Sequence, residues 1–155
     1  MIAALMLSGV ALLPSVPRPT PAPPPPVGGP AGGWNSIAVD AGDGGHFVVE
    51  ALANGVPVRF LVDTGASHVV LSPADAARLG LRPPQLRYTA EAATANGRVG
   101  LAPVTLRELR IGQLSRRGIA AVVNRAPMEM SLLGMSFLDG LEAWEARGDR
   151  LTLYW

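Results

Sequence analysis

The chain has 155 residues, of which 48% are apolar and 16% are charged, and its formal net charge is +1. A chain of this length has room for one ordinary domain around a single core. The small net charge and the scattered arginines form no basic patch, which argues against a nucleic-acid-binding protein. Cysteine is absent, so disulfides, thiol nucleophiles and cysteine-ligated zinc are excluded. The two histidines show no metal-binding spacing, and we expect no metal and no cofactor.

The first thirteen residues resemble a signal peptide or a membrane anchor. Residues 2–13 read IAALMLSGVALL, a run shorter than the ~20 residues that span a bilayer, and no basic residue precedes it. We expect either a cleaved signal or the tail of an anchor, and as an anchor residues 2–13 would tether the protein to a membrane. The domain would then be exported, or anchored in the inner membrane, and would lie in the periplasm or outside the cell. The alternative is a hydrophobic helix that docks on the domain.

Residues 14–33 form a linker rich in proline and glycine, PSVPRPTPAPPPPVGGPAGG. Proline lacks an amide hydrogen and fixes φ, so this stretch favours an extended spacer over a helix or a strand. A ligand for a proline-binding partner domain is the alternative interpretation. The folded domain is expected over residues 34–155.

Short apolar runs separated by glycine-rich turns predict a mainly β domain beyond Trp34. Residues 46–53 and 56–62 flank Asn54-Gly55, a dipeptide typical of a two-residue type I′ hairpin. A second pair of strands, 86–94 and 98–106, surrounds Asn96-Gly97. Further strands are expected at residues 109–111, 119–123, 141–146 and 151–155.

Two short helices interrupt the predicted strands. The first covers residues 74–79, with Ser72 as the N-cap, Pro73 in the first turn and Gly80 just beyond the end. A second turn of helix is expected over residues 136–141.

The motif that carries chemistry is Asp63-Thr64-Gly65, which directly follows the apolar residues 60–62. A carboxylate at the end of such a strand is partly desolvated. Gly65 lets a backbone amide approach the carboxylate, and the hydroxyl of Thr64 can fix the turn. Taken alone, the tripeptide is a weak signal, and an Asx-type turn between two strands is the simpler interpretation.

In its context, the motif resembles the active site of retropepsin-like aspartic proteases. The resemblance rests on GHF at residues 45–47, FLVDTGASHVVLS at 60–72 and LLGMSFL at 132–138. It extends over residues 45–155 and is greatest toward bacterial, single-domain, membrane-anchored members. It implies a retropepsin-like acid protease β-barrel with one or two short helices and one lobe per chain.

The resemblance also implies roles for individual residues. Asp63, Thr64 and Gly65 would be catalytic; Ala66, Ser67 and the hairpin residues Thr94, Ala95, Asn96 and Gly97, which form the flap of the family, would contact substrate; Leu132, Leu133 and Gly134 would pack behind the catalytic loop.

Aspartic proteolysis requires two facing carboxylates that share one proton. Asp-Thr-Gly occurs once in the chain, and Phe137-Leu138-Asp139-Gly140 lacks the threonine of a second copy. The second carboxylate must then come from another chain, which predicts a homodimer. The expected function is an aspartic endopeptidase that acts on peptide or protein substrates.

Two alternatives compete with this interpretation. A catalytically silent module with the retropepsin fold could serve in dimerisation or peptide binding. A serine hydrolase could use Asp63, Ser67 and His68, which are neighbours in the sequence. We disfavour the latter because adjacent Ser67 and His68 on a strand would point to opposite faces.

Overall fold

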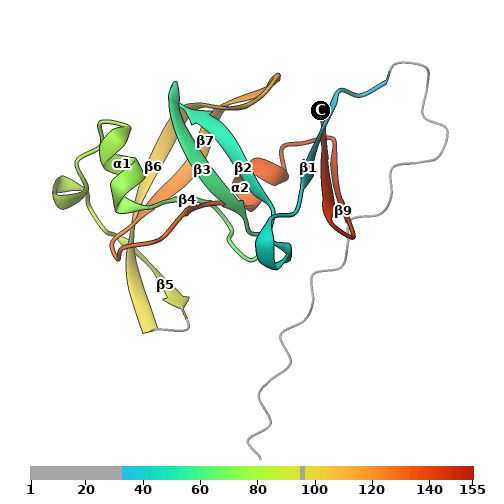
Figure 1. The fold of residues 1–155 in the computed structure, drawn as a ribbon. Helices are drawn as coiled ribbons and strands as arrows, with labels where there is room; N and C mark the ends of the chain where they lie inside the picture. The colour runs from blue at the N-terminus through green and yellow to red at the C-terminus, as the bar shows by residue number, and fades with distance from the viewer. Residues whose placement is uncertain (1–32, 95–96) are drawn as a thin grey trace, which may run out of the picture.

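The computed structural model describes residues 33–94 and 97–155. The predicted segment 1–13 and nearly all of the predicted linker lie outside the described residues. The described part is mainly β, as predicted (Figure 1). None of its helices is long and apolar enough to cross a membrane.

The elements follow one another in a simple order. The strands are β1 (Ser36–Asp40), β2 (Val48–Ala53), β3 (Val56–Val62), β4 (Val69–Leu71), β5 (Ala90–Thr94), β6 (Gly97–Ile111), β7 (Leu114–Asn124), β8 (Ser131–Leu133), β9 (Ala143–Arg147) and β10 (Arg150–Tyr154), and the α-helices are α1 (Pro73–Arg78) and α2 (Met135–Leu138). Short 3-10 turns lie at Asp43–Gly45 and Pro83–Gln85.

The larger sheet closes on itself as a barrel. Its strands are ordered β2-β3-β8-β4-β7-β6-β5, and β2 also pairs with β6. That additional pairing joins Ala53 to Leu109 and makes a ring of six strands, with β5 attached outside the ring through β6 alone. In Figure 1, β5 and the start of β6 extend away from the body as a hairpin.

The first predicted hairpin is confirmed. Ala53 pairs with Val56 across the turn, and both turn residues adopt positive φ, 50° at Asn54 and 86° at Gly55. Those values are the ones that a type I′ turn requires, and they explain the choice of Asn-Gly. The turn is also tied to β6, because the Asn54 amide nitrogen donates to the Glu108 carbonyl oxygen at 2.9 Å.

The strands from residue 86 to residue 124 differ from the prediction. β5 begins at Ala90 because a 3-10 turn precedes it, and residues 98–106 and 109–111 belong to one strand, β6. The predicted break at Arg107-Glu108 was wrong, since neither residue forms a turn and buried Leu106 and Leu109 continue the strand. The chain instead reverses at Gly112, whose φ is 56°.

Both predicted helices are present with shifted ends. Ser72 caps α1 as expected, since its Oγ accepts a hydrogen bond from the Asp75 amide at 3.1 Å. Gly80 follows α1 with φ of 81°, the left-handed conformation expected beyond a helix end. α2 begins directly after Gly134 and ends at Leu138, three residues before the predicted end at 141.

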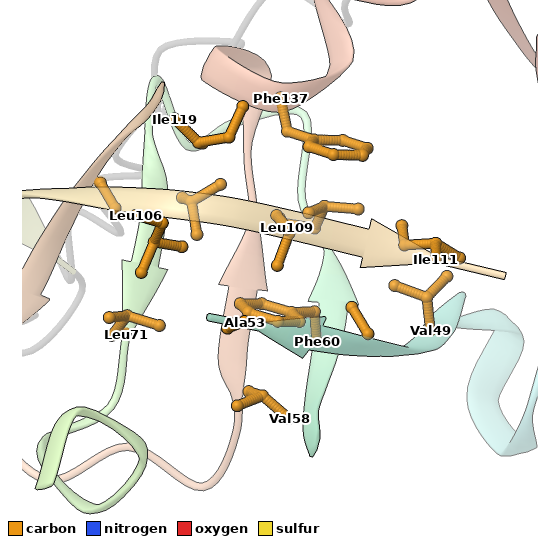
Figure 2. Close-up of a cluster of buried hydrophobic side chains, with 14 of the residues drawn as sticks. Val49, Ala53, Val58, Phe60, Leu71, Leu106, Leu109, Ile111, Ile119 and Phe137 are labelled. Carbon is orange, nitrogen blue, oxygen red and sulfur yellow. The ribbon is translucent and has the colours of Figure 1, made fainter. Parts of the chain in front are cut away.

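The hydrophobic core fills the barrel. Side chains from β2, β3, β4, β6, β7 and α2 converge there, as Figure 2 shows, and Phe60 and Phe137 are fully buried. Truncating a buried phenylalanine to alanine typically costs about 3–5 kcal/mol. The core therefore fixes the end of β3, which leads directly into Asp63.

A separate three-stranded sheet holds the two ends of the domain together. β10 lies in its centre, with β1 on one side and β9 on the other. Trp34 meets Tyr154 edge to face, with ring centroids 6.2 Å apart. β1 was not predicted, because Ser36–Asp40 is too short and too exposed to give a clear pattern.

Candidate active site

Asp63 stands at the exit of β3 and is positioned by β8. β3 pairs with β8 in parallel, with Val62 opposite Leu133, and the Asp63 amide nitrogen continues this ladder by donating to the Leu133 carbonyl oxygen at 3.1 Å. Asp63 itself is partly exposed. β8 thus fixes the backbone of Asp63 while the side chain of Asp63 remains accessible.

A tight turn follows Asp63. The Gly65 amide nitrogen donates to Asp63 Oδ1 at 2.9 Å, and the Ala66 amide nitrogen donates to the Asp63 carbonyl oxygen at 3.2 Å. A Cβ at Gly65 would lie 3.1 Å from Asp63 Oδ1, so glycine allows the amide to reach the carboxylate. Thr64 is partly buried in the same turn, and no described residue of the chain accepts a hydrogen bond from its hydroxyl.

Residues 63–68, here called the Asp63 loop, rest on the start of α2. The Met135 amide nitrogen donates to the Ala66 carbonyl oxygen at 2.8 Å, and the Ser136 amide nitrogen donates to the Ser67 carbonyl oxygen at 3.0 Å. Gly134 is buried against the loop, where a Cβ would collide with the backbone of His68. The structure therefore places Leu133 and Gly134 behind the loop, where the sequence resemblance puts them.

Ser136 is a positioning residue that sequence reasoning missed. Its Oγ accepts a hydrogen bond from the Val69 amide nitrogen at 2.9 Å and donates to the Ala120 carbonyl oxygen at 2.7 Å. One hydroxyl thus joins the start of β4, directly after the Asp63 loop, to β7. The sequence gives only a weak sign of this role, a serine two residues after the glycine of Leu-Leu-Gly.

A groove of about 790 Å³ opens beside Asp63 and is here called the Asp63 groove. Its walls are the Asp63 loop, β5 with the facing part of β6, the second half of β7, and the side chains of Met128 and Leu132. The lining is mostly apolar, as in most sites that hold a ligand. Asp63 thus stands at one wall of a mainly apolar groove.

The predicted site residues divide into three groups. Asp63, Gly65, Ala66, Ser67 and Thr94 line the groove. Thr64, Gly97, Leu133 and Gly134 are not among the lining residues. Thr64 lies in the turn, Leu133 and Gly134 lie behind the loop, and Gly97 pairs with Thr94 and accepts a hydrogen bond from the Thr94 hydroxyl at 2.7 Å. Ala95 and Asn96, the predicted tip of the hairpin, lie outside the described residues.

Several groove residues were not predicted. His68, Val70, Leu101, Val122, Asn124 and Met128 all line it, and Leu132, predicted as structural support only, lines it as well. The alternation of β7 puts Val122 and Asn124 on one face, but no sequence pattern shows that this face lines the groove. The sequence analysis ended that strand at residue 123, whereas β7 continues through Asn124.

The premise used against a serine hydrolase was wrong. Ser67 and His68 precede β4 in a bend, are both exposed and both line the groove. Within the described residues, however, no hydrogen bond joins the Ser67 hydroxyl to His68, which a nucleophile and its base require. The same residues contain no cluster of three or more His, Cys, Asp or Glu side chains that could hold a metal ion.

Carboxylates other than Asp63 are poorly placed to act with it in the same chain. Asp139 is exposed at the end of α2 and lies outside the groove. Glu91 lines the groove from β5, but its carboxylate is paired with Arg98 at 3.0 Å on the same hairpin. The described residues therefore offer one free carboxylate beside the turn.

The barrel and this aspartate turn define the class of aspartic proteases that have a single lobe per chain. The family model described as "gag-polyprotein putative aspartyl protease" matches residues 49–140, more than half of the chain. The chain belongs to the retropepsin-like aspartic protease family, as its motifs predicted.

One solved structure agrees with this assignment, and two uncharacterized proteins are also similar to this chain. The crystal structure of a retropepsin-like aspartic protease from Rickettsia conorii is similar with a TM-score of 0.72 and 37% identity, over 77% of this chain and 98% of that one. An uncharacterized protein in the cobV 5′ region of Sinorhizobium sp. is 46% identical over 110 residues, which are 70% of this chain and 47% of that protein. The uncharacterized protein RP867 of Rickettsia prowazekii is 38% identical over 117 residues, 76% of this chain and 50% of that protein. The chain thus spans about half the length of these two curated relatives.

Proposed function

We propose that this protein is an aspartic endopeptidase that works as a homodimer, with one Asp63 from each protomer. The observation that carries the proposal is a single partly exposed carboxylate, held by the Gly65 amide at 2.9 Å, at the wall of a peptide-sized groove. Two carboxylates about 3 Å apart share one proton, because two like charges at that distance cannot both ionise comfortably. A twofold axis beside Asp63 would bring two identical carboxylates together in this way.

The chemistry assigns different tasks to the two carboxylates. The ionised Asp63 takes a proton from a water molecule held between the pair, while the protonated Asp63 of the other protomer polarises the peptide carbonyl. The water oxygen attacks the carbonyl carbon as the partner's proton passes to the carbonyl oxygen. When the C–N bond breaks, the first Asp63 gives the proton it took from water to the leaving amine, and the other Asp63 takes its proton back from the hydroxyl of the intermediate, so no bond to the protein forms. Thr64, whose hydroxyl has no acceptor among the described residues of its own chain, is available for a hydrogen bond across the dyad.

The substrate would lie extended in the Asp63 groove. β5 is paired to the barrel through β6 alone, so its outer edge can accept a peptide as an added strand. The hairpin would then close over the peptide and exclude water. Apolar groove walls favour apolar side chains on either side of the cleaved bond.

The terminal sheet supports a particular way to build the dimer. The family resemblance marks the C-terminal strand as a dimer element, but β10 is paired on both sides within its own chain. The open edges of this sheet are those of β1 and β9. We therefore propose that a partner strand joins at one of these edges, because unpaired backbone groups at an edge are a template for another chain.

The location is also a proposal, which the apolar run at residues 2–13 supports. We propose that the run targets the domain to export or holds it at the inner membrane. Cell fractionation of the full chain and of a chain lacking residues 2–13 tests it. Equal recovery of both from the cytosol would exclude this location.

The endopeptidase proposal is tested with the purified full chain and its Asp63→Asn form on a peptide library. Asp139→Asn is the matched control, because it removes a carboxylate from an exposed Asp-Gly outside the groove. We expect complete loss of cleavage in Asp63→Asn and full activity in the control. The rate should rise faster than linearly with protein concentration below the dimer dissociation constant. Peptide binding without cleavage by the unmodified chain would favour the catalytically silent module.

A further inference from the structure

Asn124 occupies an unusual position on the floor of the Asp63 groove. β7 pairs with β6 so that Asn124 lies opposite Leu101 and Val122 lies opposite Pro103. Because side chains alternate along a strand, Val122 and Asn124 share one face. All four residues line the groove, so this face of the β6–β7 ladder is the floor.

Apart from Thr105 of β6, which lies on the same face, the rest of that floor is apolar. Val122 pairs with Val70 of β4, and Val70 pairs with Leu132 of β8. Asn124 therefore inserts a carboxamide into a surface of aliphatic side chains. Leucine or valine would fill the same place without a polar atom to satisfy.

The carboxamide oxygen of Asn124 lacks a partner among the described residues. The residue is 9% exposed, and its Oδ1 is buried with no hydrogen-bond donor among the described residues. Buried polar groups are nearly always paired, and an unpaired acceptor costs free energy that folding must offset. The torsion that orients an asparagine amide is broad, so the amide can turn its oxygen toward the groove. A donor that arrives with a ligand would then satisfy it.

We propose that Asn124 is a specificity-determining residue that accepts a hydrogen bond from a donor-bearing side chain of the peptide substrate. The chemical class is a neutral hydroxyl or carboxamide side chain, seated between the aliphatic groups of the floor. This inference rests on the proposed endopeptidase function and deepens it. A pocket that pairs a substrate donor discriminates against analogues without it, because they leave the acceptor unpaired. One neutral hydrogen bond corresponds to about a tenfold preference.

The test compares the full chain with Asn124→Leu on a peptide library, with cleavage sites read by mass spectrometry. Gln113→Leu is the matched control, since it removes an exposed amide at the far turn of the β6–β7 hairpin. We expect the unmodified chain and the control to prefer a hydroxyl or carboxamide side chain at one substrate position. In Asn124→Leu this roughly tenfold preference should disappear, and the variant should select leucine or methionine at the same substrate position. Asn124→Asp should shift the preference toward basic side chains, because its acceptor is charged.

Stability provides a reading that does not depend on cleavage. Replacing an unpaired buried acceptor with leucine should leave the thermal midpoint unchanged or raise it. A lower midpoint for Asn124→Leu would show that the amide is a structural partner and would overturn the inference. An unchanged cleavage profile in Asn124→Leu would overturn it as well.

The two proposals fail in different ways. If cleavage occurs but does not depend on Asp63, the endopeptidase proposal fails. If the unmodified chain cuts no peptide, the inference is decided by which library peptides it retains. Retention of donor-bearing peptides by the unmodified chain and not by Asn124→Leu supports it, and equal retention by both overturns it.

Discussion

Gly134→Ala is the substitution whose effect the structure defines most sharply. Gly134 connects β8 to α2 and faces the Asp63 loop from behind. A Cβ at this position would lie 2.5 Å from the Ala66 carbonyl oxygen and 2.7 Å from the His68 carbonyl carbon. Real Cβ contacts are essentially never so short, and both neighbours are backbone atoms that cannot rotate away. The loop and the start of α2 must therefore move apart.

The magnitude follows from what that movement breaks. Overpacking a well-packed interior costs about 1–3 kcal/mol. The two hydrogen bonds from α2 to the loop, at 2.8 and 3.0 Å, contribute about 1 kcal/mol each. We expect Gly134→Ala to lower the free energy of unfolding by about 3–5 kcal/mol, a large part of the ~5–15 kcal/mol of a typical domain. The midpoint of thermal unfolding should fall by roughly 10–20 °C.

The assay is thermal unfolding followed by tryptophan fluorescence at one fixed protein concentration, because dimerisation would make the midpoint depend on concentration. Gly42→Ala is the matched control. Its Cβ would lie 3.8 Å from the His46 carbonyl oxygen, an ordinary contact, and its φ of −83° suits any residue. A Gly134→Ala protein that unfolds within about 2 °C of the control would refute the packing argument.

Two further substitutions separate the chemistry of the loop from its support. Gly65→Ala places a Cβ 3.1 Å from Asp63 Oδ1 and displaces the amide bonded to that oxygen. We expect kcat/KM to fall about tenfold with little change in the midpoint of thermal unfolding. An unchanged kcat/KM with a lower midpoint would contradict this role. Ser136→Ala leaves the Val69 amide and the Ala120 carbonyl without their shared partner. Urea unfolding should show a loss of ~2 kcal/mol, and an unchanged urea midpoint would contradict the bridge.

Local chemistry made parts of the fold predictable. The Asn54-Gly55 turn and the cap at Ser72 depend on residues that are close in sequence, and both were predicted correctly. The extent of β6 was not predicted correctly. The prediction placed a break at Arg107-Glu108, although neither residue is typical of a turn. β8 was noticed as a motif and not as a strand, since three residues are too few to show a period.

In the candidate site, too, the features that depend on neighbouring residues could be predicted and the non-local ones could not. The turn at Asp63 could be predicted because Asp-Thr-Gly is a contiguous motif in a recognisable context. The place of Asn124 in the groove could not, because it depends on the pairing of β7 with strands far away in the sequence. The bridge through Ser136 is likewise non-local, since Ser136 lies 67 positions from Val69 and 16 positions from Ala120 in the sequence. Such pairings are decided by the packing of the whole barrel and leave no periodic signal.

β8 explains why one short strand can control the precision of the proposed dyad. Leu132 pairs with Leu61 of β3 and with Val70 of β4, so β8 holds the chain on both sides of the Asp63 loop. In the proposed twofold dimer, a substitution that displaces the loop acts in both protomers, and the components of the two displacements perpendicular to the axis add in the distance between the carboxylates. Backbone contacts at Gly134 restrict such displacement more tightly than flexible side chains would. A site assembled from two identical halves therefore benefits from a glycine packed directly against each loop.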